Sequence, residues 1–165
     1  MDAEEMRDFL GLPQEIPGAV LLEFHKLGLA YSYVEARFLG GNANFGEARD
    51  YAESFVHNTD INVDRYFSFF KNRYVLAEDA HIRLQNLSNF KPNIIRRIHD
   101  SLGLEHPTKV DKVEAIFLVI IRLRNNALHG NKAGYLFDEE QAVLISQAND
   151  FLSEYLNAIP MNRII

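Results

Sequence analysis

AIFLVII, the stretch from Ala115 to Ile121, decides the fold of this chain. All seven residues are apolar, so a helix through them is apolar on every face and has to be buried by neighbours all round. Residues that favour helix ends stand on both sides of this stretch. Thr108 can cap the helix together with Asp111, and Gly130 suits the left-handed position that ends one. We therefore expect a central helix over 109–129.

The segments before and after this helix also follow a helical pattern. Apolar residues recur three or four positions apart, and sustained strand-like alternation is hard to find. The five prolines stand where helices could begin or end, at Pro13, Pro17, Pro92, Pro107 and Pro160. We predict helices over 18–39, 46–57, 62–76, 79–89, 93–102, 109–129 and 139–158. The expected fold class is all-α: an antiparallel helical bundle with a buried central helix and short accessory helices.

Length and composition indicate a single globular domain. The chain has 165 residues, 47% of them hydrophobic and 24% charged, which suits one domain with a sizeable core. We expect that domain to span 1–165, with 1–17 a loosely ordered N-terminal segment. Cysteine is absent, which excludes a disulfide scaffold, Cys-ligated metal sites and thiol catalysis.

No targeting or metal-binding pattern stands out. The N-terminal sequence MDAEEMRDFL lacks the basic and apolar regions of a secretion signal, and no apolar run approaches the ~18 residues of a membrane span. We therefore expect a cytoplasmic protein without a membrane partner. The histidines outside the central helix lack ligand-like spacing, so neither a metal nor a cofactor is expected.

The net charge of −6 hides an uneven distribution. Between Arg65 and Lys132 there are 12 lysines and arginines against 6 acidic residues, whereas the flanks hold 5 against 17. The basic part is either a set of solvated helix faces or a surface for phosphates. Lys91, Arg96 and Arg97, around the helix that follows Pro92, are the candidates for sequence-independent phosphate contacts.

The central helix changes chemistry abruptly after its apolar run, where residues 122–129 read RLRNNALH. Burying an unpaired guanidinium costs several kcal/mol, so these polar residues need a wet cavity, partners or a subunit interface. One helical stripe contains Arg122, Asn125, Asn126 and His129. Arg124 lies about 140° around the helix from His129.

The sequence Arg124-Asn125-Asn126-Ala127-Leu128-His129 resembles the R-x4-6-H motif of HEPN-domain ribonucleases. The longer string IRLRNNALHGNK, residues 121–132, is similar to the RLRNN-x-FHG-x-K form of a bacterial branch. The aromatic-rich residues 66–74 are similar to a helix upstream of that motif, so the motif-bearing part covers about 62–158. These aromatic side chains could stack on bases, but at helical spacing core or dimer contacts are more common, and we expect them at an interface.

The resemblance implies an all-α bundle that forms a homodimer, with two motifs lining one cleft that cleaves RNA without a metal. His129 would act as general acid or base, Arg124 would stabilise the transition state, and Asn125 would orient His129 or the phosphate. Further RNA contacts are expected from Arg122, Asn126, Lys132, Lys91, Arg96 and Arg97. The implied role is a toxin or phage-defence effector.

Two points bear on partners. In HEPN toxins paired with a nucleotidyltransferase antitoxin a Tyr commonly follows the His by two positions, but here Asn131 occupies that place. An antitoxin of that type is therefore not favoured, whereas another antitoxin or a regulatory protein is compatible with the sequence as a partner. The alternative to the nuclease is a non-catalytic HEPN module that binds a nucleotide, an RNA or a regulatory protein through the same cleft.

Overall fold

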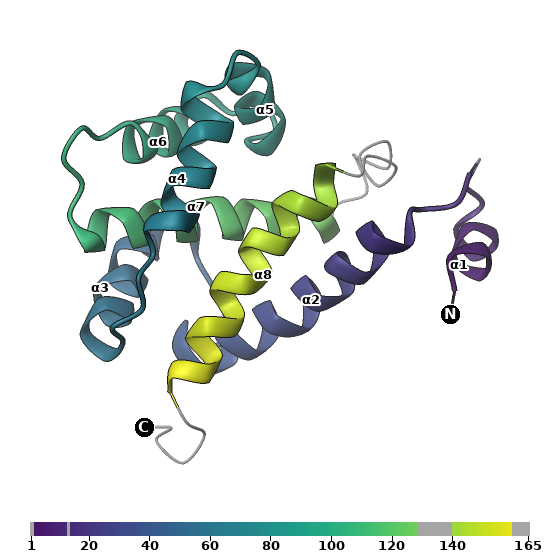
Figure 1. The fold of residues 1–165 in the computed structure, drawn as a ribbon, viewed down its shortest axis with the longest axis horizontal. Coiled ribbons are helices and arrows are strands. Elements are labelled where there is room, and N and C mark those ends of the chain that lie inside the picture. The colour runs from purple at the N-terminus through teal and green to yellow at the C-terminus, as the bar shows by residue number, and fades with distance from the viewer. Residues whose placement is uncertain (1, 13, 129–139, 160–165) are drawn as a thin grey trace.

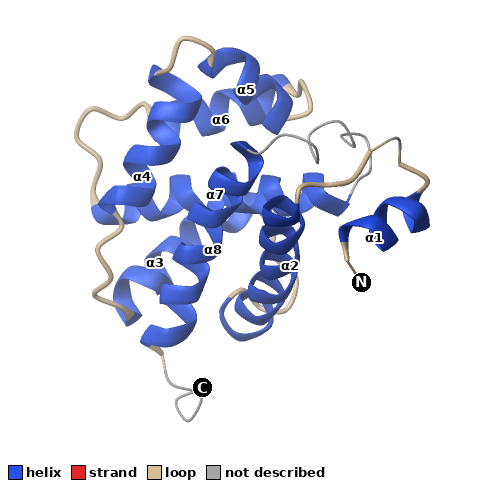
Figure 2. Cartoon of the chain, turned by 45° about the vertical axis from the view of Figure 1, so that its right-hand side comes forward, coloured by secondary structure: helices blue, strands red, loops and turns tan. Residues whose placement is uncertain are grey.

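The computed structural model describes the whole chain except residues 1, 13, 129–139 and 160–165. The elements are α1 (Ala3–Leu10), α2 (Gly18–Phe38), the 3-10 helix η1 (Phe45–Glu47), α3 (Ala48–Asn58), α4 (Asp64–Lys71), the π-helix η2 (Asn72–Leu76), α5 (Ala80–Leu87), α6 (Pro92–Leu102), α7 (Lys109–Leu128) and α8 (Glu140–Ala158). The described residues contain no strand, as Figure 2 shows. The prediction of an all-α helical bundle is confirmed.

Helix α7 is the buried centre of this bundle, as its apolar run predicts. Residues 115–121 are each at most 1% exposed. In Figure 1, α4, α5 and α6 lie above α7, whereas α3 lies below it and α8 crosses in front. The ring of Phe117 packs against Phe55, Phe151 and Tyr155, with centroids 5.5–6.3 Å apart, so one aromatic cluster joins α3, α7 and α8.

The predicted capping pair at the start of α7 is also confirmed. The backbone N–H of Thr108 donates to Oδ2 of Asp111 at 2.8 Å, and the N–H of Asp111 donates to Oγ1 of Thr108 at 3.2 Å. Arg49 of α3 then donates to Asp111 and to Glu114 at 2.7 and 3.0 Å. The N-terminal half of α7 is thereby held in place.

Helix α1 was not predicted within the N-terminal segment 1–17. It forms because Asp2 and Glu5 make a capping box, with reciprocal hydrogen bonds of 2.9 Å, and because Gly11 ends the helix at φ 63°. None of its residues is buried, and Phe9 is 75% exposed. Local capping rather than packing therefore accounts for this helix, which stands at the edge of the molecule in Figure 2.

The two long helices α2 and α8 run parallel, so the expected antiparallel arrangement does not hold for this pair. Nδ2 of Asn149 donates to the carbonyl of Glu23 at 2.9 Å, and Arg37 donates to the carbonyl of Ile159 at 2.7 Å. The later residue of α2 thus contacts the later residue at the C-terminal end of α8, as in a parallel pair, and Figure 1 shows the two helices side by side. Short loops enforce antiparallel neighbours, but five α-helices and the two elements η1 and η2 separate α2 from α8.

The aromatic residues of the 66–74 segment belong to the core, which corrects the expectation of an interface. The rings of Tyr66, Phe67, Phe70 and Tyr74 are at most 5% exposed, and only Phe69 is partly accessible. The segment continues from α4 into η2, where the N–H of Ala77 donates to the carbonyl of Asn72 at 2.7 Å. Its apolar face is thus used within one chain.

Candidate functional site

The α7 tip, which we define as residues 122–126, is where the buried helix becomes polar. Arg122 is only 7% exposed, and Arg124, Asn125 and Asn126 are half-buried. Helix α7 is described as far as Leu128, so the tip occupies the last two described turns. These polar groups are therefore held against neighbouring helices rather than extended into solvent.

Two side chains of the tip bind one backbone carbonyl on α5. Nε of Arg122 donates to the carbonyl oxygen of Leu87 at 3.3 Å, and Nδ2 of Asn126 donates to the same oxygen at 2.9 Å. A carbonyl in the last turn of a helix has no intrahelical donor, so Leu87 is free to accept both. The predicted common stripe of Arg122 and Asn126 is confirmed.

The next residues form a strained turn between α5 and α6, which we call the α5–α6 corner (residues 87–91). The N–H of Phe90 donates to the carbonyl of Gln85 at 2.9 Å, and the N–H of Asn89 donates to that of Asn86 at 3.3 Å. These are the two bonds of a Schellman motif. Asn89 (φ 51°) and Phe90 (φ 58°) both adopt the left-handed region, which Asn tolerates but which costs other residues about 1–2 kcal/mol.

A side-chain hydrogen bond ties this corner to the tip. Nδ2 of Asn89 donates to Oδ1 of Asn126 at 3.1 Å. Asn126 therefore binds the corner twice, through its amide nitrogen to Leu87 and through its amide oxygen to Asn89. The conformation of the corner and the position of the tip are directly coupled.

The guanidinium of Arg122 is buried, and no described residue supplies a counter-charge. Within the described residues its Nη2 has no hydrogen-bond partner, and no carboxylate forms an ion pair with it. Burial alone lowers the pKa of Arg122. Elsewhere Arg49, Arg65 and Arg97 each pair with a carboxylate. Among the residues that the structure describes, the hydroxyl of Ser88 in the corner is likewise buried without a hydrogen-bond partner.

Arg124 faces a different neighbour, about 200° around α7 from Arg122. Its guanidinium carbon lies 5.2 Å from the ring centroid of Tyr31 on α2, a cation–π geometry. Tyr31 is only 2% exposed, and burial followed by the charge of Glu35 raises the pKa of its hydroxyl, which Arg124 opposes. Within the described part of the chain, Arg124 also has no carboxylate partner.

The remaining motif residues are only partly placed. Asn125 is half-buried and forms no hydrogen bond with the described residues. His129 and Lys132, predicted as a catalytic and an RNA-binding residue, lie outside the described residues. The structure therefore brings Arg122 and Asn126 together and sets Arg124 apart from them.

The three basic residues predicted after the α5–α6 turn separate into two kinds. Lys91 and Arg96 are exposed, and no described carboxylate pairs with them. Arg97 is half-buried, lies 3.5 Å from Glu114 of α7 and stacks over the ring of Phe45 at 5.1 Å. Lys91 and Arg96 remain accessible for phosphate, whereas the charge of Arg97 is used in packing α6 on α7.

Sequence reasoning did not find Tyr31, the carbonyl of Leu87, Asn89 or Phe90. A backbone acceptor leaves no trace in residue type, and Tyr31 fits an ordinary apolar stripe. The Asn-Phe-Lys-Pro sequence at 89–92 did carry a signal for this corner. Asn is favoured at the left-handed position that ends a helix, and Pro is favoured at the start of the next one.

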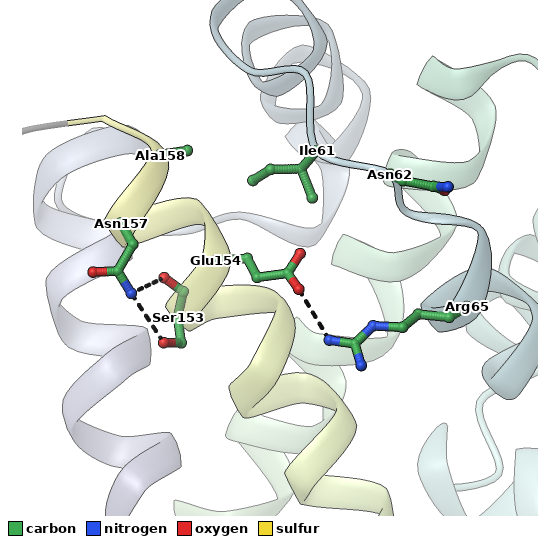
Figure 3. A pocket seen from close by; sticks show the side chains of 7 residues that line it. All are labelled: Ile61, Asn62, Arg65, Ser153, Glu154, Asn157 and Ala158. Atoms are coloured by element: carbon green, nitrogen blue, oxygen red, sulfur yellow. Dashed lines mark hydrogen bonds and ion pairs between the residues drawn. The ribbon is translucent and has the colours of Figure 1, made fainter.

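A cleft of about 650 Å³ lies elsewhere, between the C-terminal turns of α8 and the start of α4. Figure 3 shows Arg65 and Glu154 pointing toward each other across it, with an ion pair of 2.9 Å. None of its lining residues belongs to the tip or the corner. Among the residues that the structure describes, no group of three acidic or histidine side chains could hold a metal, and no helix qualifies as a transmembrane span.

Comparison with known proteins gives no relative. No family model matches the chain, and neither a curated protein nor a solved structure matches it significantly. The function has to be argued from the tip, the corner and the motif itself.

Proposed function

We propose that this chain is an endoribonuclease of the HEPN type that works as a homodimer on single-stranded or loop RNA. Two R-x4-H motifs, Arg124 with His129 from each copy, would line the cleavage site. Arg122, Asn126 and Lys132 would hold the RNA beside it, and Lys91 and Arg96 would contact phosphates further along. A role as a toxin or phage-defence effector is consistent with such an activity.

The observation that supports this proposal most directly is the unbalanced positive charge of the tip. Arg122 and Arg124 are buried and half-buried, and neither pairs with a described carboxylate. A desolvated guanidinium without a counter-ion is unfavourable in an empty site and becomes favourable when an anion binds. A phosphodiester supplies that anion with planar acceptor geometry.

The proposed reaction is attack by a ribose 2′-hydroxyl on the adjacent phosphorus. One His129 takes the proton of the 2′-hydroxyl while the 2′-oxygen bonds to phosphorus. The bond from phosphorus to the 5′-oxygen then breaks, and the leaving oxygen receives a proton from the second His129. Arg124 stabilises the charge on the phosphorane-like transition state. The products are a 2′,3′-cyclic phosphate and a 5′-hydroxyl, and no metal takes part.

Cleavage of a structured RNA in EDTA tests this directly. Wild type should produce cyclic phosphate ends, and His129→Ala and Arg124→Ala should each reduce the rate at least 100-fold, in the range expected for loss of acid–base or electrostatic catalysis. His106→Ala is the matched control, because His106 is exposed in the loop before α7. Equal RNA loss in wild type and His129→Ala would reject the proposal.

The contact of Arg124 with Tyr31 favours a second candidate, a non-catalytic module of the same fold. An arginine committed to a cation–π contact on α2 has a packing role without any reaction. In that case the protein binds RNA or a nucleotide without cleaving it. Tyr31→Leu and Arg124→Ala should then lower the free energy of unfolding by similar amounts, and no variant should change the amount of cleaved RNA.

A further inference from the structure

Phe90 is an exposed aromatic residue in a strained backbone conformation. Its side chain is 65% exposed, and its backbone is left-handed at φ 58°. Glycine would adopt this backbone without strain, and a polar residue would suit the solvent. A large aromatic ring that is mostly exposed on a strained backbone points to a role in binding.

The position of Phe90 is fixed relative to the α7 tip. It directly follows Asn89, whose side chain is bonded to Asn126, and it lies in the corner that Arg122 and Asn126 hold through Leu87. The Schellman bonds fix its backbone as well. The backbone that carries the ring, which we call the Phe90 platform, is therefore fixed beside the candidate motif.

The sequence around Phe90 is basic. From Ala80 to His99 the sequence contains four lysines and arginines and no acidic residue, in a chain whose net charge is −6. Lys91 is exposed and follows Phe90 in the sequence, and Arg96 is exposed on the following helix α6. An exposed aromatic ring flanked by cations suits a single-stranded nucleic acid, which offers both a flat base and phosphates.

We infer that Phe90 stacks on an unpaired RNA base while Lys91 and Arg96 contact the flanking phosphates. This inference rests on the proposed function, because it supplies the substrate-binding platform for that site. A second copy of the chain fits this surface poorly. Two-fold pairing of the corner would bring the same cations from both copies together, and like charges across an interface are unfavourable.

The chain contains no tryptophan, so Phe90→Trp creates a single fluorescent reporter at the platform. We would place it in the His129→Ala background, in which the proposed nuclease is inactive, and titrate with an eight-nucleotide oligoadenylate. Stacking predicts saturable quenching of the indole. Inorganic polyphosphate, which has no bases, should compete for binding without quenching. Phe9→Trp is the matched control, since Phe9 is also exposed but lies on α1, and its fluorescence should not change.

Affinity measurements separate stacking from charge. Phe90→Ala should weaken oligoadenylate binding about 5- to 100-fold at an unchanged salt slope, because stacking is worth that much per base. Phe90→Tyr should retain most affinity. Lys91→Ala should instead reduce the salt dependence of binding by about one counterion. Phe90→Gly should lose affinity like Phe90→Ala while folding at least as stably as wild type, which excludes misfolding as the cause.

The outcomes distinguish this inference from the proposed nuclease. Quenching at Phe90→Trp, together with RNA cleavage that is insensitive to His129→Ala, rejects the nuclease and retains the stacking platform. An affinity for oligoadenylate within twofold of wild type in Phe90→Ala, or absence of quenching, rejects the platform. A shift from dimer to monomer in Phe90→Ala without loss of RNA affinity would assign the ring to a contact between copies instead.

Discussion

Replacing Arg122 with methionine is expected to stabilise the protein while impairing anion binding. The guanidinium is 7% exposed without a carboxylate partner among the described residues, and a buried unpaired ion carries a desolvation penalty of several kcal/mol. The substitution removes one long hydrogen bond to Leu87, of 3.3 Å, worth about 1 kcal/mol. Asn126 still donates to that carbonyl at 2.9 Å. Methionine keeps most of the methylene packing, so the net gain is about 1–3 kcal/mol.

Urea unfolding followed by circular dichroism measures this change, with Arg122→Met compared with Arg122→Ala and with wild type. Alanine should lose stability, because it leaves a cavity that methionine fills. Burial lowers the pKa of Arg122, so the charge destabilises the fold at every pH below that value and is relieved only as pH rises through it. The advantage of methionine should therefore persist through the acidic and neutral range.

A loss of 2 kcal/mol or more in Arg122→Met would refute this reasoning, because it would mean that the guanidinium has a favourable partner. Oligoadenylate binding should fall in the same variant. Higher stability combined with weaker RNA binding is typical of a residue kept for function rather than for folding.

Three further changes test other parts of the structure. Thr108→Ala should lower the free energy of unfolding by about 1 kcal/mol through loss of the α7 cap, measured by urea unfolding. The hydrogen bond from Arg49 is the main cause that lowers the pKa of Asp111 below its ordinary 3.8. The stability that this ionised carboxylate contributes is present above pH 3.8 and is lost as pH falls through the lowered pKa. Asp111→Asn should therefore flatten the acid limb of a curve of unfolding free energy against pH. An unchanged acid limb would contradict the assignment. Asn89→Ala should lose about 1–2 kcal/mol, since it strains the left-handed backbone and removes the bond to Asn126, whereas Asn89→Gly should lose less; equal losses would argue against backbone strain.

The features predicted correctly from sequence are those that depend on local chemistry. AIFLVII specifies burial by its composition, and the capping pair of Thr108 and Asp111 needs only three residues of spacing. Helical periodicity likewise places Arg122 and Asn126 on one side of α7. The capping box of Asp2 and Glu5 is an equally local signal, although helix α1 was not predicted from it.

The features that could not be predicted depend on tertiary contacts. The shared acceptor of Arg122 and Asn126 is a backbone carbonyl 35 residues before Arg122, and any residue type provides one. The ring beneath Arg124 comes from α2, more than 90 positions away. The burial of the 66–74 aromatic face was compatible with two interpretations, because a helical stripe looks the same whether its partner is the same chain or another.

The parallel pairing of α2 with α8 has a consequence for how the chain is made. The contact between Glu23 and Asn149 joins residues 126 positions apart, and synthesis at about 5–20 residues per second takes roughly 6–25 s to cover that distance. During this interval the inner face of α2, with Leu27 and Val34 both at most 2% exposed in the finished fold, has no α8 to cover it. The nascent chain therefore emerges with an apolar face of α2 that α8 covers only later, and we expect ribosome-associated chaperones to bind α2 in the interval.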